Sequence, residues 1–209
     1  MRPSDIDEVM EIEHQSFPTP WMADAYRYEI QHNVNAHYYV IRPQVELPVS
    51  QRNNGWRGKI RQFLGSKHSH SSVPILGYVG FWLVAGEAHI STIAVHPGVR
   101  RRGIGELLLV QVIEDALEFE AEFVTLEVRI SNHAAQNLYE KYGFKREGCR
   151  RGYYSDTRED AWIMTVQFIE YAEYHTIFRE KKRQLLDKLL HMHVNDQPNQ
   201  ASSDPAAYD

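Results

Sequence analysis

The sequence has few of the features that mark secreted or membrane proteins. Its 209 residues include one cysteine, Cys149, so an intramolecular disulfide is excluded and a reducing compartment is expected. No run of about eighteen apolar residues, the length that indicates a membrane-spanning helix, occurs in it. Residues 1–8 are too polar for a signal peptide. These absences favour a soluble protein that works in the cytoplasm.

Positive charge is not in excess either. Lysine and arginine number 23 against 28 aspartates and glutamates, which gives a formal net charge of −5. This balance offers no support for a nucleic-acid-binding protein. Hydrophobic residues make up 43% of the chain and charged residues 24%, as in ordinary globular domains. A chain of this length predicts one domain with appendages.

The spacing of apolar residues predicts an α/β fold. Ser4 with Asp7 indicates the capped start of a helix, and Gly143 is expected to end another. Residues 87–142 follow the order strand, turn, helix, strand, helix, which implies an α/β layer structure with a parallel pair in its middle. The expected helices are 4–16, 21–31, 104–120, 132–142 and 172–193. The expected strands are 37–41, 75–84, 87–95, 123–130, 144–153 and 160–168.

Three segments stand apart from this pattern. Residues 43–73 carry five basic side chains against one acidic one and have little periodicity. We interpret them as a flexible insertion between two hairpin strands. Residues 169–194 form an extension whose helix either packs on the domain or mediates dimerisation. Residues 195–209 are polar and expected to be disordered.

The stretch Arg100-Arg101-Arg102-Gly103-Ile104-Gly105 lies between a predicted strand and a long predicted helix. Glycines let backbone N–H groups approach a ligand, and a helix N-terminus carries partial positive charge. The stretch therefore favours a pyrophosphate cradle, the alternative being a surface turn with solvated arginines. The third glycine of a dinucleotide fingerprint would fall at Leu108, and no Gly-Lys-Ser/Thr follows. Glu106 would repel a phosphate, although an acid also suits the first turn of a helix.

The strand expected at 123–130 has one polar face. Thr125, Glu127 and Arg129 alternate with apolar residues and therefore point the same way. A middle strand of an α/β sheet is normally apolar on both faces. Glu127 is therefore either a site residue or a structural acid paired with Arg129.

These motifs together resemble a known family. His96-Pro97 followed by Arg100-x-x-Gly103-x-Gly105 resembles the acetyl-CoA loop of the GNAT superfamily of N-acetyltransferases. The wider pattern resembles the RimI-type ribosomal protein alanine N-acetyltransferases, and it covers residues 2–168 apart from 43–73. The motifs that carry this wider likeness are Phe17-Pro18-x-Pro20-Trp21, Leu126-Glu127-Val128-Arg129-x-Ser131-Asn132, Leu138-Tyr139-x-x-x-Gly143-Phe144, Arg150-x-x-Tyr153-Tyr154 and Arg158-Glu159-Asp160-Ala161-x-x-Met164.

The resemblance implies a GNAT domain over residues 1–168, built on a central mixed sheet of six or seven strands flanked by helices, with acetyl-CoA as co-substrate and no metal. In this family the strand before the loop binds the pantetheine arm, and the loop amides bind the pyrophosphate. The residues implied to contact acetyl-CoA are Ile93, Ala94, Val95, Arg100, Arg101, Arg102, Gly103, Ile104, Gly105, Glu106 and Asn132.

The implied reaction is direct transfer of acetyl to a protein α-amine, the N-terminal alanine of small-subunit ribosomal protein eighteen. An α-amino group has a pKa near 8, so a base should take its proton, and the departing thiolate benefits from an acid. The resemblance makes Glu127 the base, through water, and Tyr139 the acid. Without the resemblance, Tyr139 shares an apolar stripe with Leu138 and Tyr142 and would be a core residue.

Arg150, Tyr153 and Tyr154 are candidates for holding the substrate N-terminus, the alternative being an aromatic hairpin tip packed on the domain. Because neighbours on a strand face opposite ways, only one of the two tyrosines should point inward. The basic insertion at 43–73 either contacts ribosomal RNA or an acidic partner, or is a solvated loop.

Two rival functions stay open. One is an acetyltransferase for broader N-termini or for small amines, which would need an acidic pocket. The other is a silent acetyl-CoA-binding module that anchors partners, and the presence of both Glu127 and Tyr139 argues against it. The pairs His68/His70 and His191/His193 supply two ligands each at most, so no metal site is expected. Cys149 has no recognisable catalytic partner and is interpreted as a small packed residue.

Overall fold

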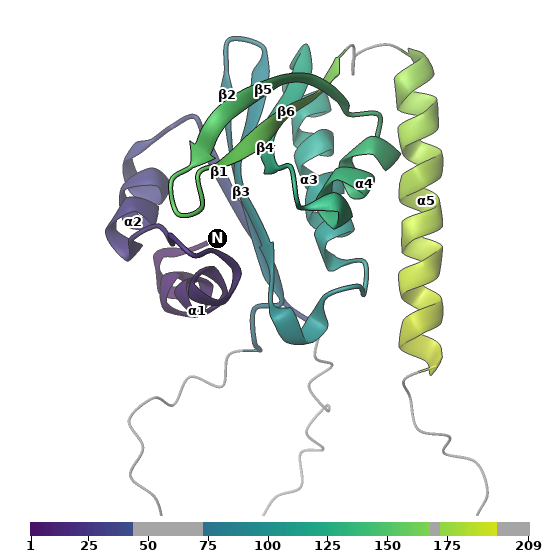
Figure 1. The fold of residues 1–209 in the computed structure, drawn as a ribbon. Coiled ribbons are helices and arrows are strands. Elements are labelled where there is room, and N and C mark those ends of the chain that lie inside the picture. Colours follow the sequence, from purple (N-terminus) through teal and green to yellow (C-terminus); the bar gives the residue numbers. More distant parts are fainter. Residues whose placement is uncertain (44–72, 168–171, 196–209) are drawn as a thin grey trace, which may run out of the picture.

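The structure is a computed structural model that describes residues 1–43, 73–167 and 172–195 (Figure 1). Within these ranges the chain forms a six-stranded mixed sheet with helices on both faces, which confirms the predicted fold class. None of the helices described is long and apolar enough to cross a membrane. The elements in chain order are η1 (Pro3–Asp5), α1 (Ile6–Ser16), α2 (Ala23–His32), β1 (Ala36–Ile41), β2 (Gly77–Val84), β3 (Glu87–Val95), η2 (Pro97–Val99), α3 (Ile104–Glu118), β4 (Phe123–Arg129), α4 (His133–Lys141), β5 (Lys145–Tyr154), β6 (Glu159–Gln167) and α5 (Ala172–Asn195).

The parallel pair predicted in the middle of the sheet is present. The strand order is β1-β2-β3-β4-β6-β5, and among the described strands β3 and β4 alone run parallel. Helix α3 makes the crossover that a parallel pair requires. β1 and β2 are antiparallel neighbours, so the segment interpreted as an insertion does separate two hairpin strands. Residues 44–72 and 196–209, which include most of that segment and nearly all of the predicted tail, lie outside the described residues.

Two hydrophobic cores lie on opposite faces of the sheet. Helices α1 and α2 cover one face, and α3 and α4 cover the other, with α5 outside them (Figure 1). The larger core contains Leu109 and Ile113 of α3, and the smaller contains Ile12, Tyr26 and Tyr78. Each fully buried side chain of this size contributes about 1.5–3 kcal/mol relative to exposure. The sheet is therefore anchored from both sides, and its middle strands are rigid supports for a site.

The first helix starts later than its sequence pattern predicts. Ser4 is not the N-cap, because η1 precedes α1 and the helix begins at Ile6. Pro3 stands at the first position of η1, where its fixed φ favours a helical turn. The Asp5 carboxylate accepts the backbone N–H of Arg2 at 2.7 Å. The predicted stop after α4 is confirmed, since Gly143 has a φ of +87°.

A bulge in β3 determines which side chains face which core. Ile90 and Thr92 pair with successive residues of β2, so Ser91 is the extra residue. The Ser91 hydroxyl donates to the Gly80 carbonyl at 3.1 Å. Ile90 packs in the larger core, whereas Ala94, four residues on, packs in the smaller one. Residues four apart in a regular strand face the same way, so the bulge reverses the faces of β3 halfway along it.

The sheet opens beside this bulge. β3 and β4 pair only from Glu87 opposite Phe123 to Ile90 opposite Leu126. Beyond that point β3 stays paired with β2, and β4 with β6. The backbone groups at the inner edges of both strands therefore face a gap, where they can bind a ligand that lies along β3.

Helix α5 packs back on the domain, as the first of the two roles left open for it requires. Its Phe178 and Leu185 are 4% and 2% exposed and join the larger core. The Tyr174 hydroxyl donates to the Tyr142 carbonyl at 3.1 Å. These contacts hold α5 against the outer side of α3 and α4 (Figure 1).

Candidate active site

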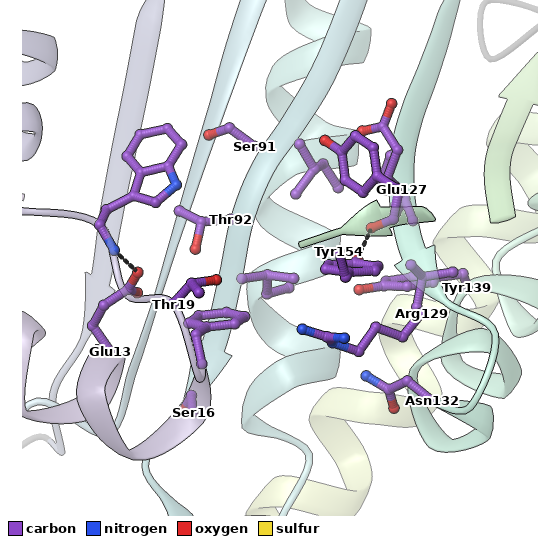
Figure 2. Close-up of a pocket in the computed structure, with 17 residues that line it drawn as sticks. Glu13, Ser16, Thr19, Ser91, Thr92, Glu127, Arg129, Asn132, Tyr139 and Tyr154 are labelled. Carbon is purple, nitrogen blue, oxygen red and sulfur yellow. Dashed lines mark hydrogen bonds between the residues drawn. The ribbon is translucent and has the colours of Figure 1, made fainter. Parts of the chain in front are cut away.

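Two adjoining cavities occupy the opening of the sheet. The first, of about 430 Å³, lies between the α1–α2 connection, the bulged middle of β3 and the ends of β4 and β5, and we call it the Glu127 cavity (Figure 2). The second, of about 570 Å³, lies between the end of β3, the turn at residues 100–106, α4 and α5, and we call it the turn cavity. The cavities share the lining residues Ser16, Phe17, Ile93, Asn132 and Tyr139. They are therefore two halves of one continuous groove.

Glu127 lies at the Glu127 cavity with both carboxylate oxygens engaged. Its side chain is 7% exposed, His89 Nε2 lies 2.9 Å from Oε2, and Arg150 Nη2 lies 3.0 Å from Oε1. The hydrogen bond with His89 and the charges of His89 and Arg150 lower the pKa of the Glu127 carboxyl, although burial opposes this. In turn, the hydrogen bond with Glu127 raises the pKa of the His89 imidazole. Glu127 is therefore a well-ionised carboxylate at neutral pH.

The alternative pairing of Glu127 with Arg129 is wrong. Arg129 pairs with Asp156 at 2.8 Å and Glu159 at 3.2 Å, and its guanidinium lies 3.8 Å from the ring centroid of Tyr154. Asp156 lies in the turn between β5 and β6, and Glu159 is the first residue of β6. The antiparallel pairing of β4 with β6 brings both acids beside Arg129. Arg129 therefore supports the rim of the cavity instead of neutralising Glu127.

Tyr139 lies where the two cavities meet. It is 5% exposed, lies in the last turn of α4 and lines both cavities. Figure 2 shows it beside Tyr154, whose hydroxyl donates to the Glu127 carbonyl at 3.4 Å. Burial and the neighbouring Tyr154 raise the pKa of Tyr139 above its usual value. The phenol therefore keeps its proton at neutral pH and can donate a hydrogen bond into the groove.

The arginine-rich turn has the backbone shape of an anion cradle. Arg101 and Gly103 have φ values of +66° and +84°, so left-handed residues alternate along it. A non-glycine residue in this region costs about 1 kcal/mol or more and is typical of functional sites. The first helical hydrogen bond of α3 runs from the Leu107 N–H to the Gly103 carbonyl. The preceding amides of α3 are therefore available to a ligand at the positive end of the helix dipole.

Most of the residues implied to bind acetyl-CoA line the turn cavity. The side chains of Arg102 and Ile104 do not, since Arg102 is exposed to solvent and Ile104 packs in the larger core. Those that line it are Ile93, Ala94, Val95, Arg100, Arg101, Gly103, Gly105, Glu106 and Asn132.

Two polar side chains of the turn cavity have structural partners. The Glu106 carboxylate accepts the Tyr142 hydroxyl at 2.8 Å and pairs with the Lys141 ammonium. The negative charge of Glu106, which would repel a phosphate, is therefore compensated by Lys141. The Asn132 side-chain oxygen accepts the Ala135 N–H at 3.2 Å and caps α4. Asn132 thus orders the helix that carries Tyr139.

Both tyrosines of the β5–β6 tip line the Glu127 cavity, so the expectation that only one points inward is wrong. The register between β5 and β6 shifts between Arg150 and Tyr154, and Gly152 has a φ of +57°. This irregularity breaks the alternation of faces, and the rings of Tyr153 and Tyr154 meet edge to face at 5.2 Å. Arg150 is not among the lining residues and instead pairs with Glu127.

A buried acid that does not stand out in the sequence, Glu13, lines the same cavity. Glu13 of α1 is 1% exposed, and its carboxylate accepts the Trp21 N–H at 2.8 Å and the Tyr26 hydroxyl at 3.0 Å. It also accepts the Tyr78 hydroxyl, and burial raises its pKa. The available signal was its place in the helix, because Glu13 follows Ile6 and Val9 in one apolar stripe. Glu13 ties the connection after α1 to the sheet.

Cys149 and the two histidine pairs are the remaining candidates from the sequence. Cys149 is exposed, so the expectation of a packed residue is wrong; the edge strand β5 leaves its side chain uncovered. His68 and His70 lie outside the described residues, and so does the side chain of His193. Among the side chains that the structure describes, no group of three histidine, cysteine or acidic residues could hold a metal ion.

Comparison with known proteins identifies the family. The Acetyltransferase (GNAT) family matches residues 6–144. A Bacillus subtilis (strain 168) protein named "Putative ribosomal protein bS18-alanine N-acetyltransferase" is 38% identical over 170 residues, which are 81% of this chain and 94% of that protein. The Escherichia coli (strain K12) ribosomal protein bS18-alanine N-acetyltransferase is 43% identical over 86 residues, 40% of this chain and 58% of that protein.

Solved structures of similar proteins agree with this family assignment. The crystal structure of the E. coli ribosomal-protein-S18-alanine N-acetyltransferase superposes with a TM-score of 0.60 at 25% identity, over 80% of this chain and 90% of that chain. Arabidopsis thaliana NAA60 in complex with acetyl-CoA has a TM-score of 0.62 at 15% identity, over 80% of this chain and 95% of that chain, and shares the fold. With its splayed mixed sheet and its glycine-rich turn, this chain belongs to the GNAT family of acetyl-CoA-dependent N-acetyltransferases.

Proposed function

We propose that this chain transfers the acetyl group of acetyl-CoA to the N-terminal alanine of ribosomal protein bS18. The B. subtilis and E. coli relatives carry this activity in their names. The observation that supports it most is the meeting of the two cavities at Tyr139. A coenzyme in the turn cavity and a peptide N-terminus in the Glu127 cavity would bring thioester and amine together there.

The turn cavity fits acetyl-CoA as co-substrate. Residues 93–95 offer the unpaired edge of β3 to the pantetheine arm, and the amides of 101–106 offer a cradle to the pyrophosphate. Asn132, at the junction of the cavities, would be a further contact. The compensated charge of Glu106 removes the main electrostatic objection to a phosphate at this place.

In the proposed mechanism Glu127 acts as general base through a water molecule. Its carboxylate is ionised at neutral pH, but its two partners make it a weak base, which suits a relay better than direct contact with the amine. The neutral amine attacks the thioester carbonyl, a C–N bond forms, and the C–S bond breaks. Tyr139 acts as general acid, since its protonated phenol donates a hydrogen bond to the developing thiolate.

Arg150 acts on this site through Glu127 in our proposal, and Tyr153 and Tyr154 form the aromatic wall along which the peptide lies. A small cationic amine is a weaker candidate for the acceptor. Among the described lining residues of the Glu127 cavity, the two carboxylates, Glu13 and Glu127, both already have partners.

The test is acetyl transfer from acetyl-CoA to a panel of N-terminal peptides and free small amines. We expect selective transfer to the bS18 peptide that begins with alanine, and none to the same peptide with a blocked α-amine. Equal or faster transfer to small amines, or transfer to every peptide alike, would contradict the proposed acceptor.

A further inference from the structure

The C-terminal helix contributes a side chain to the turn cavity. Lys188 of α5 lines that cavity together with Arg100, Arg101 and Gly103. The GNAT family match ends at residue 144, so α5 lies outside it. A helix that the family match does not include therefore forms part of the wall around the proposed coenzyme site.

The same turn of α5 supports the anion cradle. A Cβ placed on Gly103 would lie 3.3 Å from Leu185 Cδ1 and 3.1 Å from Leu189 Cδ2, so these two leucines press on the cradle. Residues three and four apart share a helix face, so Leu185, Lys188 and Leu189 project together. The leucines that touch Gly103 thus fix where Lys188 reaches the cavity.

Several contacts fix the position of this part of α5. Lys182, one and a half turns before Lys188, pairs with Glu114 of α3. Leu185 is 2% exposed, and Tyr174 is hydrogen-bonded to the backbone after α4. The position of Lys188 therefore follows from contacts along most of the helix.

The charges around the cavity leave Lys188 as an available cation. The Arg100 guanidinium donates to the Val95 carbonyl at 3.2 Å and to the Ser16 hydroxyl at 3.1 Å. Glu106 is already paired with Lys141. Within the described residues Lys188 forms no ion pair. An ammonium beside backbone donors at a helix N-terminus is suited to a phosphate group.

We propose that α5 closes the coenzyme groove and that Lys188 binds a phosphate group of coenzyme A. This inference rests on the proposed function only in taking the turn cavity as the coenzyme site, and it does not depend on the acceptor.

The experiment is calorimetric titration of the full-length chain with coenzyme A, which needs no acceptor. The variants are Lys188→Gln and Lys188→Glu, with Lys181→Gln as the matched control. Lys181 lies two helical turns earlier on the same face and lines a separate hollow beside Tyr142 and Phe178. Thermal unfolding of each variant checks that the fold is intact.

We expect Lys188→Gln to weaken binding about 3- to 10-fold, Lys188→Glu to weaken it further, and Lys181→Gln to leave it unchanged. Higher salt should reduce the difference between the native chain and Lys188→Gln. A repeat with 3′-dephospho-coenzyme A locates the contact: an equal loss assigns it to the pyrophosphate, and no loss assigns it to the 3′-phosphate.

Native affinity in Lys188→Gln, or an equal loss in Lys181→Gln, would overturn the inference. A wrong acceptor assignment would leave these titrations unaffected. Failure of the native chain to bind coenzyme A would instead contradict the coenzyme site itself, so the failures are distinguishable.

Discussion

His89 Nε2 lies 2.9 Å from Glu127 Oε2, across the parallel pair of strands β3 and β4. The residues are 38 positions apart in the chain, and each changes the pKa of the other. The proposed base is therefore half of an ion pair before any substrate binds.

The pH dependence of stability should report this ion pair. His89 has a raised pKa, so its contribution is fully present below 6.5 and is lost as pH rises through that raised value. Glu127 has a lowered pKa, so its contribution is present above 4.5 and is lost as pH falls through that lowered value. We expect His89→Gln to reduce the free energy of unfolding most between these pH values, by about 1–2 kcal/mol. Urea denaturation at several pH values measures this, and a loss independent of pH would contradict it.

Replacing Glu127 should separate catalysis from coenzyme binding. Glu127 lines the Glu127 cavity and not the turn cavity. We expect Glu127→Gln to lower kcat by about 10²- to 10⁴-fold with nearly native affinity for acetyl-CoA. Glu140→Gln, which removes an exposed acid of α4, is the control. Loss of coenzyme binding in Glu127→Gln would show that Glu127 is a structural residue.

Two tyrosines on one helical stretch allow a matched comparison. We expect Tyr139→Phe to slow transfer by about 10²-fold with little change in stability. In Tyr142→Phe the hydroxyl bound to Glu106 is lost, so we expect a loss of stability of about 1 kcal/mol and nearly native kcat at saturating acetyl-CoA. Steady-state kinetics and thermal unfolding distinguish them. An unchanged rate in Tyr139→Phe would remove this residue from the mechanism.

A side chain at Gly103 should disturb the cradle in two ways, through the backbone conformation and through contact with α5. Its φ of +84° disfavours any side chain, and a Cβ there would press on Leu185 and Leu189. We expect Gly103→Ala to lower stability by about 1–2 kcal/mol and to raise KM for acetyl-CoA. Adding Leu189→Ala should relieve the contact but not the backbone strain, so KM should recover only in part. Native KM in Gly103→Ala would contradict the cradle.

Removal of the segment between β1 and β2 tests the insertion hypothesis. Arg42 donates to the Val73 carbonyl and pairs with Asp5 and Glu8, so the deletion should spare both ends and remove 44–72 alone. With a short glycine-serine link in its place, we expect a folded protein whose circular dichroism spectrum and melting temperature stay close to native. An unfolded product would show that a core element was mistaken for an insertion.

Local sequence pattern was sufficient to predict most of the elements. Alternation and helical spacing are properties of neighbouring residues, so β3 is predicted with the bounds it has, and α3 and α4 begin where expected within one residue. The parallel pair follows because a glycine-rich turn and a helix connect β3 to β4. The turn at 100–106 also stands out in the sequence through its glycines and arginines, whereas Tyr139 is singled out only by the family resemblance, because its spacing alone indicates a core residue.

What sequence could not supply was the partner of each charged group. The one partner that the sequence offers for Glu127 is Arg129, on the same face of the same strand, but the structure pairs Glu127 with His89 of another strand and Arg150 of a third. Such contacts depend on strand order and register. Irregular backbone was equally unpredictable from the sequence. At Tyr153 and Tyr154 a register shift breaks the alternation of faces, so both side chains point to the same side.

Ser91 divides β3 into two lengths that pack against different layers. Deleting this single residue would restore regular alternation and exchange the surroundings of Ile93 and Ala94, and of every later residue in the strand. Side chains that now pack against α1 and α2 would then face the larger core, and those that now face the larger core would point toward α1 and α2. β3 should therefore tolerate changes in residue type far better than any change in length, and related chains should vary in length only in the connections on either side of it.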